Sequence, residues 1–287
     1  MVTKILMTVA IIAALGLFGH RAWQLLSMLR LGKPENRTDN LSRRIRREIR
    51  VVFGQQKLLQ WPFPGVMHFL IFWGFVILFT TIVEAFGTAY SSAFALPLIG
   101  HWGPLATLQD ALAGLVLVGI LMAVFIRKAL RPGRFAGSHL GEADRILLLI
   151  AGIMVAIIGL RATNIALGRF PYPRHYAFIS SWVASQLFVG LSAHARHVWN
   201  DLLLWAHSLI ILGFLVYLGY SKHLHIITAP FNVFFSSTAS RPRGALKPLD
   251  VDLENMAEDD VIGAATITDL TWKQLLDTYT CTECGRC

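Results

Sequence analysis

Residues 65–86 read GVMHFLIFWGFVILFTTIVEAF and include only two ionisable side chains, His68 and Glu84. The apolar residues occupy every side of a helix rather than one stripe, which is typical of a helix surrounded by apolar material. At 1.5 Å per residue, about 20 such residues cross the ~30 Å hydrocarbon core of a bilayer. We therefore predict a transmembrane helix over about residues 64–88.

Four further apolar runs have a similar length, at about residues 5–29, 104–127, 145–167 and 199–222. The first run is too long for the apolar part of a cleavable signal, and no small-residue cleavage site follows it. Of the 287 residues, 55% are hydrophobic and 15% are charged, a balance that a bilayer explains better than a soluble core. We predict an all-α integral membrane protein whose five-helix membrane domain covers residues 1–230.

Basic residues gather in two of the loops between these helices. The loop after the first helix carries Arg30, Lys33, Arg37, Arg43, Arg44, Arg46, Arg47, Arg50 and Lys57, and the loop after the third carries Arg127, Lys128, Arg131 and Arg134. The positive-inside rule places both loops in the cytoplasm, with the N-terminus outside the inner (cytoplasmic) membrane and the C-terminus inside. Topology and contact with anionic lipids explain the net charge of +9, so we expect no nucleic-acid partner.

Three histidines fall where apolar surroundings make a polar side chain unfavourable. His68 lies about two turns into the second helix, His207 lies in the outer half of the fifth, and His225 lies at its inner end. His207 and His225 are five helical turns apart, so we expect both on one face, about 27 Å from each other. Imidazoles of two facing helices suit the axial positions of a haem. We predict haem b between His68 and His225, and a second haem is possible at His207.

Other interpretations of these histidines remain open. His223 could replace His225 as the inner ligand, and histidines at helix ends also form interhelical hydrogen bonds or lie among lipid headgroups. A transporter or channel would keep polar groups in its helices too. The sequence shows neither an inverted repeat nor matching helices broken by Gly or Pro, so it favours a redox protein.

All three cysteines lie in the last seven residues, CTECGRC, as Cys281, Cys284 and Cys287. This spacing matches the first part of the bacterial run C-x2-C-x2-C-x3-C-P, in which one loop supplies several ligands of an iron-sulfur cluster. Zinc is the alternative metal, but it usually takes two separated ligand pairs. We predict a cytoplasmic [4Fe-4S] cluster whose fourth ligand comes from a longer protein, or else from another chain.

The segment before the cysteines is polar and rich in Ser, Pro and Asp. We predict an extended linker over residues 231–268. Leu270, Leu275 and Leu276 then follow helical spacing, so a short helix should deliver the cysteine loop. Residues 269–287 would be the start of a truncated, cytoplasmic 4Fe-4S domain of ferredoxin-like type.

HFLIFWGF and SKHLH resemble the nitrate reductase gamma-subunit family, which includes membrane subunits of heterodisulfide reductase and of sulfite-reduction complexes. The last helix of that family has a histidine, an 18-residue step, and a second histidine before a short Ala-Pro segment. His207, His225 and the segment IITAP match this pattern. His68 matches the inner haem ligand of the family's second helix.

The sequence departs from that family pattern at one position. The family's second helix has a further histidine ten residues after the first, and Leu78 stands at that place here. The resemblance therefore leaves His207 to pair with another residue, such as His20 or His101, or to serve a quinone pocket.

The combination of this membrane domain with CTECGRC is still more similar to fused membrane iron-sulfur oxidoreductases. These take electrons from electron-transfer flavoprotein and reduce menaquinone, so the resemblance implies a flavoprotein partner and a quinone substrate. Glu84, Arg161 and Asn164, near outer helix ends, are then candidates for quinone or proton contacts. The alternative function is a haem b anchor subunit of a nitrate, heterodisulfide or sulfite-reduction complex.

Overall fold

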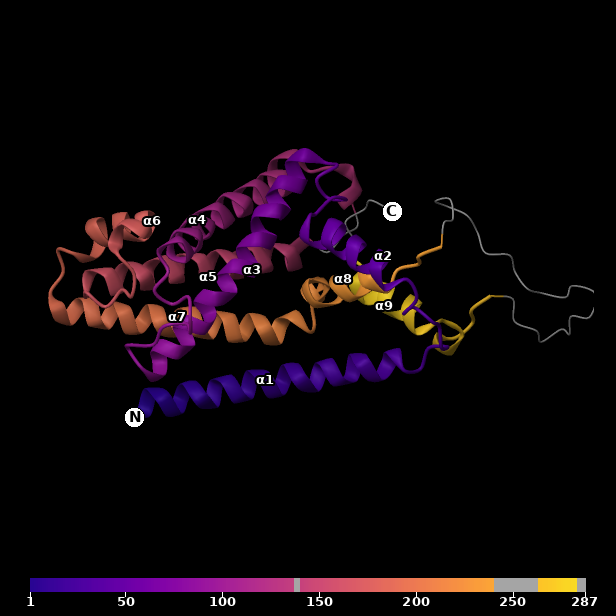
Figure 1. Ribbon diagram of the computed structural model, residues 1–287, viewed down its shortest axis with the longest axis horizontal. Helices are drawn as coiled ribbons and strands as arrows, with labels where there is room; N and C mark the ends of the chain where they lie inside the picture. Colours follow the sequence, from indigo (N-terminus) through magenta and orange to yellow (C-terminus); the bar gives the residue numbers. More distant parts are fainter. Residues whose placement is uncertain (137–139, 240–262, 283–287) are drawn as a thin grey trace, which may run out of the picture. The chain divides into compact units, whose positions relative to one another are not determined.

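The protein is represented by a computed structural model that describes residues 1–136, 140–239 and 263–282 (Figure 1). Its α-helices are α1 (Val2–Leu29), α2 (Leu41–Glu48), α3 (Pro62–Tyr90), α4 (Gly103–Phe125), α5 (Leu140–Ala166), α6 (Phe178–Val183), α7 (Ala193–Leu218), α8 (His225–Phe234) and α9 (Trp272–Thr280). The π-helical turns are η1 (Ile49–Phe53), η2 (Ile126–Leu130) and η5 (Ala184–Phe188), and the 3-10 turns are η3 (Gly133–Phe135), η4 (Arg174–Tyr176), η6 (Lys222–Leu224) and η7 (Ile267–Asp269).

Five helical segments are long and apolar enough to cross a membrane, and they confirm the five predicted spans. They are Val2–Leu29, Pro62–Tyr90, Gly103–Leu130, Gly141–Ala166 and Ala193–Leu218. Each lies close to a predicted range, because the length of an uninterrupted apolar run largely determines where such a helix can lie.

The chain divides into two compact units. The first contains Met1–Leu17 and Leu58–Tyr217, and the second contains Phe18–Lys57 and the described residues from Leu218 onward. The first unit therefore holds α3 to α7, and the second holds α2, α8 and α9. The boundary between the units falls inside α1.

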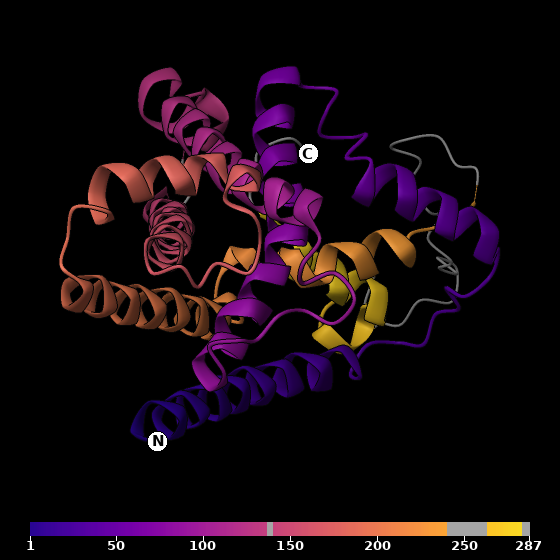
Figure 2. The same cartoon turned by 60° about the vertical axis from the view of Figure 1, so that its left-hand side comes forward.

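In the first unit, α3 packs along α4, and α4 packs against α5 and α6. Gly74 permits the close approach of α3 and α4, because a Cβ atom there would lie 2.1 Å from Cγ2 of Val116. Figure 2 shows α5 nearly end-on, with α6 on one side and α7 on the other. α5 has the largest buried share among the five spans, so its polar residues are enclosed by neighbouring helices.

The short helix α6 and its extension η5 lie between the fourth and fifth predicted spans. Ala177 and Phe188 are buried against Ala162 and Ile165 of α5. The guanidinium of Arg196 donates hydrogen bonds to the carbonyls of Phe188, at 3.0 Å, and of Ala166, at 3.1 Å. These bonds satisfy carbonyls that the helix ends leave unpaired. The apolar run is about half the spanning length, and for that reason the search for spans missed it.

In the second unit, α8 packs against both α2 and α9. The ring of Trp272 in α9 meets the ring of Phe235 edge-on, with centroids 5.2 Å apart. Leu275 and Leu276 are buried, which confirms the short helix predicted before the cysteines. The side chain of Thr271 caps that helix by accepting a hydrogen bond from the backbone of Gln274.

The fifth predicted span, about residues 199–222, corresponds to a helix that ends before residue 222. α7 ends at Leu218, and a new helix, α8, begins at His225. Gly219 is a weak helix former, and Ser221 adopts an extended conformation in which its hydroxyl accepts a hydrogen bond from the backbone of His223. His207 and His225 therefore do not share one continuous helix, and the five-turn spacing does not fix their relative direction.

The boundary between the membrane domain and the linker, after residue 230, stays a prediction. Helix α8 continues to Phe234 with Pro230 inside it. Most of the predicted linker, from residue 240 to residue 262, lies outside the described residues, as do Cys284 and Cys287.

Candidate functional site

Polar side chains from several helices meet at one end of the first unit. The end of α3, the start of α4 and the end of α5 lie at the same level, because consecutive helices joined by short loops run antiparallel. We define the polar cluster as Thr80 and Glu84 of α3, Gln109 and Asp110 of α4, Arg161 and Asn164 of α5, and Tyr172 of the following loop.

The carboxylate of Glu84 accepts two hydrogen bonds. The hydroxyl of Tyr172 donates to Oε1 at 2.5 Å, and Nε2 of Gln109 donates to Oε2 at 3.2 Å. Burial, together with the adjoining Glu84 carboxylate, raises the pKa of the Tyr172 hydroxyl, which therefore remains a proton donor at physiological pH. Tyr172 is only 4% exposed and is a member of the cluster.

Arg161 is the positive charge of the polar cluster and is 5% exposed. Its Nη1 donates to Oε1 of Gln109 at 2.6 Å, and its Nη2 donates to the carbonyl of Ala106 at 3.1 Å. The guanidinium also lies over the ring of Phe170, 4.9 Å from the centroid. Its Nε is buried and has no hydrogen-bond partner among the described residues, so one donor is left for a water or a substrate oxygen.

Asp110 is the second carboxylate of the cluster; it is fully buried and lies next to Gln109 in the sequence. Its Oδ2 accepts a bond from the backbone N–H of Ile179 at 2.6 Å, and its Oδ1 accepts bonds from the backbone and the hydroxyl of Ser180 at 3.1 and 2.5 Å. These donors belong to the first turn of α6, where a negative charge is favoured. Asp110 and Glu84 both attract Arg161 electrostatically.

A cavity of about 40 Å³ lies against the polar cluster. Glu84, Arg161, Asn164 and Tyr172 line it, together with apolar side chains. The side-chain amide of Asn200 in α7 donates to Oδ1 of Asn164 at 2.9 Å and so fixes its orientation. The structure thus brings the three candidates Glu84, Arg161 and Asn164 to one cavity.

The sequence analysis did not single out Gln109, Asp110 or Tyr172. The first two interrupt the apolar run of the third span, so the criterion that selected Glu84 could also have found them. No feature of the sequence distinguished Tyr172 from an aromatic residue at the membrane interface.

His207 of α7 is 1% exposed. Neither ring nitrogen has a hydrogen-bond partner among the described residues, although the carbonyl of Ile153 in α5 lies near the ring without ordinary hydrogen-bond geometry. An unsatisfied imidazole in an apolar interior is costly. An iron ion on one nitrogen and the Ile153 carbonyl on the other would satisfy both, so His207 fits an axial haem ligand.

The other histidines of the first unit are less enclosed. His68 lies in α3 and is partly buried. His101 is exposed, with its Nδ1 3.2 Å from the carbonyl of Pro171. In the second unit, exposed His20 is 3.1 Å from Nε2 of Gln24.

His223 and His225 lie together in the second unit, with ring centroids 5.2 Å apart. Nδ1 of His225 is 2.8 Å from the carbonyl of Lys222, and we assign the proton to Nδ1 because a carbonyl oxygen can only accept. Burial lowers the pKa of the His225 imidazole, which keeps it neutral at physiological pH. A neutral ring whose Nδ1–H bonds to a carbonyl presents Nε2 to a metal, so His225 also fits a haem ligand. Its proposed partner His68 belongs to the first unit.

Helix α9 packs against the segments that carry this histidine pair and ends next to the first cysteine. It packs against η6 and α8, which carry His223 and His225, and it ends at Thr280, directly before the exposed Cys281. Nζ of Lys273 donates to Oδ1 of Asn232 in α8 at 2.8 Å. No group of three His, Cys, Asp or Glu side chains is placed to hold a metal ion within the part of the chain that the structure describes.

The fold and these side chains define an all-α protein with five helices able to cross a membrane and with ionisable groups buried between them.

The chain is similar to EtfAB:quinone oxidoreductase of Syntrophomonas wolfei, with 29% identity over 281 residues, which are 94% of this chain and 38% of that protein. It is also similar to the probable iron-sulfur-binding oxidoreductase FadF of Bacillus subtilis, with 28% identity over 277 residues, which are 96% of this chain and 38% of FadF. No protein-family model and no solved structure matches the chain. The two curated relatives are longer than this chain, which spans about two fifths of their length.

Proposed function

We propose that this chain is the membrane part of an oxidoreductase that passes electrons between a soluble donor, the electron-transfer flavoprotein, and a quinone. The observation that carries the proposal is the packing of α9, which ends directly before Cys281, against the segments that hold His223 and His225. A cysteine loop and a pair of histidines on adjacent helices would bring two redox centres close together. Similarity to a protein named EtfAB:quinone oxidoreductase supports the donor and the quinone.

The proposed ligands follow from the chemistry of the side chains. Haem b is assigned to His68 and His225, with His223 as the alternative inner ligand and His207 as an outer ligand. A [4Fe-4S] cluster is assigned to Cys281, Cys284 and Cys287, with a fourth ligand from outside this chain. When bound, these groups supply transfer of single electrons. The chain's own contribution to the haem is orientation of His225 by the Lys222 carbonyl and exclusion of water by apolar helices.

The quinone, menaquinone by resemblance, is proposed to react near the polar cluster, with Glu84, Arg161 and Asn164 as the contacting or proton-exchanging groups. In the proposed orientation, with the N-terminus outside the inner membrane and the C-terminus in the cytoplasm, this cluster lies near the outer surface. Electrons would enter at the inner side, near Cys281 and His225, and leave toward the outer side.

A reduced-minus-oxidised optical spectrum of the full-length membrane protein tests the haem assignment. We expect b-type bands that His68→Ala and His225→Ala each remove, while the matched variant His194→Ala, at an exposed position of α7, retains them. A wild-type spectrum without b-type bands would rule out haem.

The donor and the acceptor need a separate experiment. Reduced electron-transfer flavoprotein should reduce a menaquinone analogue when the full-length protein is added, and iron and sulfide analysis should show a cluster. Zinc without iron would exclude the cluster. Co-purification with a nitrate, heterodisulfide or sulfite-reduction enzyme, without quinone reduction by the flavoprotein, would instead support the anchor subunit.

A further inference from the structure

We propose that Glu84 exchanges protons with the quinone through water, while Arg161 and Asp110 set the charge that makes this exchange possible. This inference rests on the proposed quinone reaction and deepens it. It assigns the polar cluster to proton transfer and not to binding of the quinone ring.

The charges of the cluster give the first reason. Arg161 contributes one positive charge, whereas Asp110 and Glu84 contribute two carboxyl groups. Asp110 accepts three hydrogen bonds from Ile179 and Ser180, so both of its oxygens act as acceptors, as in a carboxylate. The cluster is then neutral when Glu84 is protonated and carries one negative charge when Glu84 is ionised. Since net charge between apolar helices is costly, the protonated form of Glu84 is accessible.

The hydrogen bonds around Glu84 suit both protonation forms. The Tyr172 hydroxyl can donate to the carboxylate or accept from the carboxyl group, because a hydroxyl rotates between the two roles. Gln109 has a fixed direction, since its Oε1 accepts from Arg161 while its Nε2 donates to Thr80 and Glu84. One partner adjusts while the other stays in place, so Glu84 can gain or lose a proton without a change in the helices.

The volume of the cavity indicates that Glu84 exchanges protons with the quinone through water and not by direct contact. At about 40 Å³ it has room for a water or two, whereas sites for small organic ligands usually measure several hundred Å³. A quinone ring therefore does not fit beside Glu84 in this conformation. Water in the cavity would connect the Glu84 carboxyl to a ring at the edge of the helices.

The proton balance of the step is closed. Reduction of a quinone to a quinol takes two electrons, supplied by the reduced flavoprotein, and two protons. Glu84 gives these two protons one after the other. After each transfer it is a carboxylate, which Tyr172 and Gln109 stabilise, until it is protonated again from the outer aqueous phase. In the reverse direction, the quinol gives a proton to the carboxylate.

Dicyclohexylcarbodiimide tests the protonation directly, because the reagent adds to protonated carboxyl groups in apolar surroundings and forms a stable N-acylurea. Mass spectrometry of the treated full-length protein should find the adduct at Glu84 and should find none at that position in Glu84→Gln. The reaction with a menaquinone analogue should slow about 100-fold in Glu84→Gln, as expected for loss of a general acid or base, and Glu84→Asp should recover part of the rate.

The outcomes separate this inference from the proposed function. If the wild type reduces quinone and Glu84→Gln does so at the same rate, the proton role is wrong and the function stands. If the wild type reduces no quinone with the flavoprotein, the function fails and the proton role fails with it. Reduction of the iron-sulfur centre by the flavoprotein serves as the control for folding of each variant.

A second inference has an independent basis in α2. We infer that the outer face of α2 and η1 lies on the surface of a bilayer that contains anionic phospholipid. The inner face of this helix is fixed to the second unit, where Nη1 of Arg44 donates to the carbonyls of Phe234 and Ser236 at 2.7 and 2.9 Å. Arg44 is 1% exposed, and Val52 is also buried.

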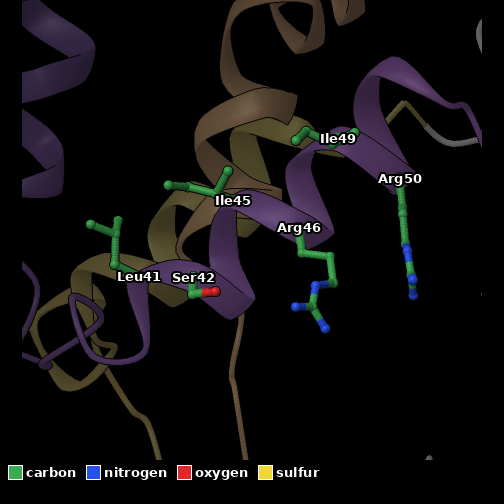
Figure 3. Close-up of a pocket in the computed structure, with 6 residues that line it drawn as sticks. All are labelled: Leu41, Ser42, Ile45, Arg46, Ile49 and Arg50. Atoms are coloured by element: carbon green, nitrogen blue, oxygen red, sulfur yellow. The ribbon is translucent and has the colours of Figure 1, made fainter.

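The opposite face is apolar and exposed. Leu41, Ile45, Ile49 and Phe53 recur every fourth residue, and their exposed fractions are 59%, 46%, 59% and 44%. Figure 3 shows the first three along one side of the helix, with Arg46 and Arg50 extending from the adjacent side. An apolar stripe flanked by arginines matches the boundary between acyl chains and anionic headgroups. The helix also lies between two predicted spans, α1 and α3, so it stays close to the bilayer.

A photoreactive benzoylphenylalanine at Ile45 tests this placement in the full-length protein, reconstituted into vesicles of phosphatidylglycerol and phosphatidylcholine. We expect a covalent lipid adduct, enriched in phosphatidylglycerol, and loss of that enrichment in the double variant Arg46→Gln with Arg50→Gln. An adduct with added electron-transfer flavoprotein, or no lipid adduct, would assign this face to something other than the bilayer and overturn the inference.

Discussion

The polar cluster and His207 are two buried polar sites in the same unit, yet their surroundings differ. Asp110 and Gln109 are fully buried. Gln109 accepts a hydrogen bond from α5 and donates to α3, and Asp110 accepts a hydrogen bond from α6. His207 is almost as deeply buried, but its ring nitrogens have no hydrogen-bond partner among the described residues.

This difference separates two reasons for a polar group to lie between apolar helices. The polar cluster is satisfied almost entirely by the chain's own atoms, so it contributes to stability even before any substrate arrives. The imidazole of His207 is destabilising until another group binds it. Substitutions should therefore lower stability at the first site and cofactor content at the second.

The largest effect is expected for His207→Ala. If His207 is an outer haem ligand, the haem-to-protein ratio should fall by one whole haem, as measured by the pyridine haemochrome assay. Without haem, the melting temperature of the variant should fall only by the cost of the cavity that the shorter side chain leaves, since no hydrogen bond is lost. An unchanged haem ratio would show that His207 is not a ligand, and His194→Ala provides the matched control.

Arg161→Met should destabilise the protein strongly, because it leaves Glu84 and Asp110 without their buried counter-charge. Removing one partner of a buried ion pair typically costs about 3–5 kcal/mol. Thermal unfolding in detergent should show the loss, and adding Glu84→Gln should recover part of it by removing one carboxylate. Arg169→Met, at an exposed position, is the control and should have little effect. Equal melting temperatures for wild type and Arg161→Met would contradict the central role of the guanidinium.

A moderate effect is expected for Asp110→Asn. The change keeps the shape of the side chain but removes the charge that accepts hydrogen bonds from the first turn of α6, and such bonds contribute about 1.5–3 kcal/mol. Hydrogen exchange of the α6 amides should accelerate while exchange in α3 stays slow. Asp201→Asn, on the exposed side of α7, should leave both unchanged. Unaltered exchange in α6 would show that Asp110 does not hold that helix.

The smallest effect is expected for Asp39→Asn in the second unit, where the ion pair with Arg44 has an exposed acidic partner. Hydrogen bonds from Thr238 and then Arg44 hold the pKa of the Asp39 carboxyl below its usual value of 3.8. Its stabilising contribution is therefore complete above that usual value and is lost as the pH falls through the lowered pKa. The small difference in melting temperature between variant and wild type should stay constant from pH 8 to 5 and decrease below pH 3.8. A difference that changes near pH 6 would point to another group.

The five spans and the helix before the cysteines were predictable, because the length and periodicity of apolar residues act locally. The end of α7 was not predicted, because the backbone conformation around Gly219 and Ser221 ends the helix, and this conformation is not visible in the pattern of apolar residues. Helix α6 was missed because its apolar run is too short to span a membrane and depends on contacts with α5.

The polar cluster shows the limit of sequence reasoning more clearly. Glu84, Arg161 and Asn164 could be selected one by one, since each is a polar residue in an apolar segment. Their meeting at one cavity depends on how α3, α4 and α5 pack, which no single segment encodes. Gln109 forms hydrogen bonds with both Glu84 and Arg161, and this role depends on that packing.

The backbone pairing of Lys33 with the start of α9 has a consequence for biosynthesis. Lys33 exchanges hydrogen bonds with Leu270 and Trp272, and the indole of Trp272 donates to the carbonyl of Glu35, 237 positions earlier in the chain. The segment after α1 leaves the ribosome early and has to wait for these partners until Trp272 has been translated. The second unit is therefore completed last, after all five apolar helices have been synthesised, and premature termination before residue 270 would leave its early half without its backbone partners.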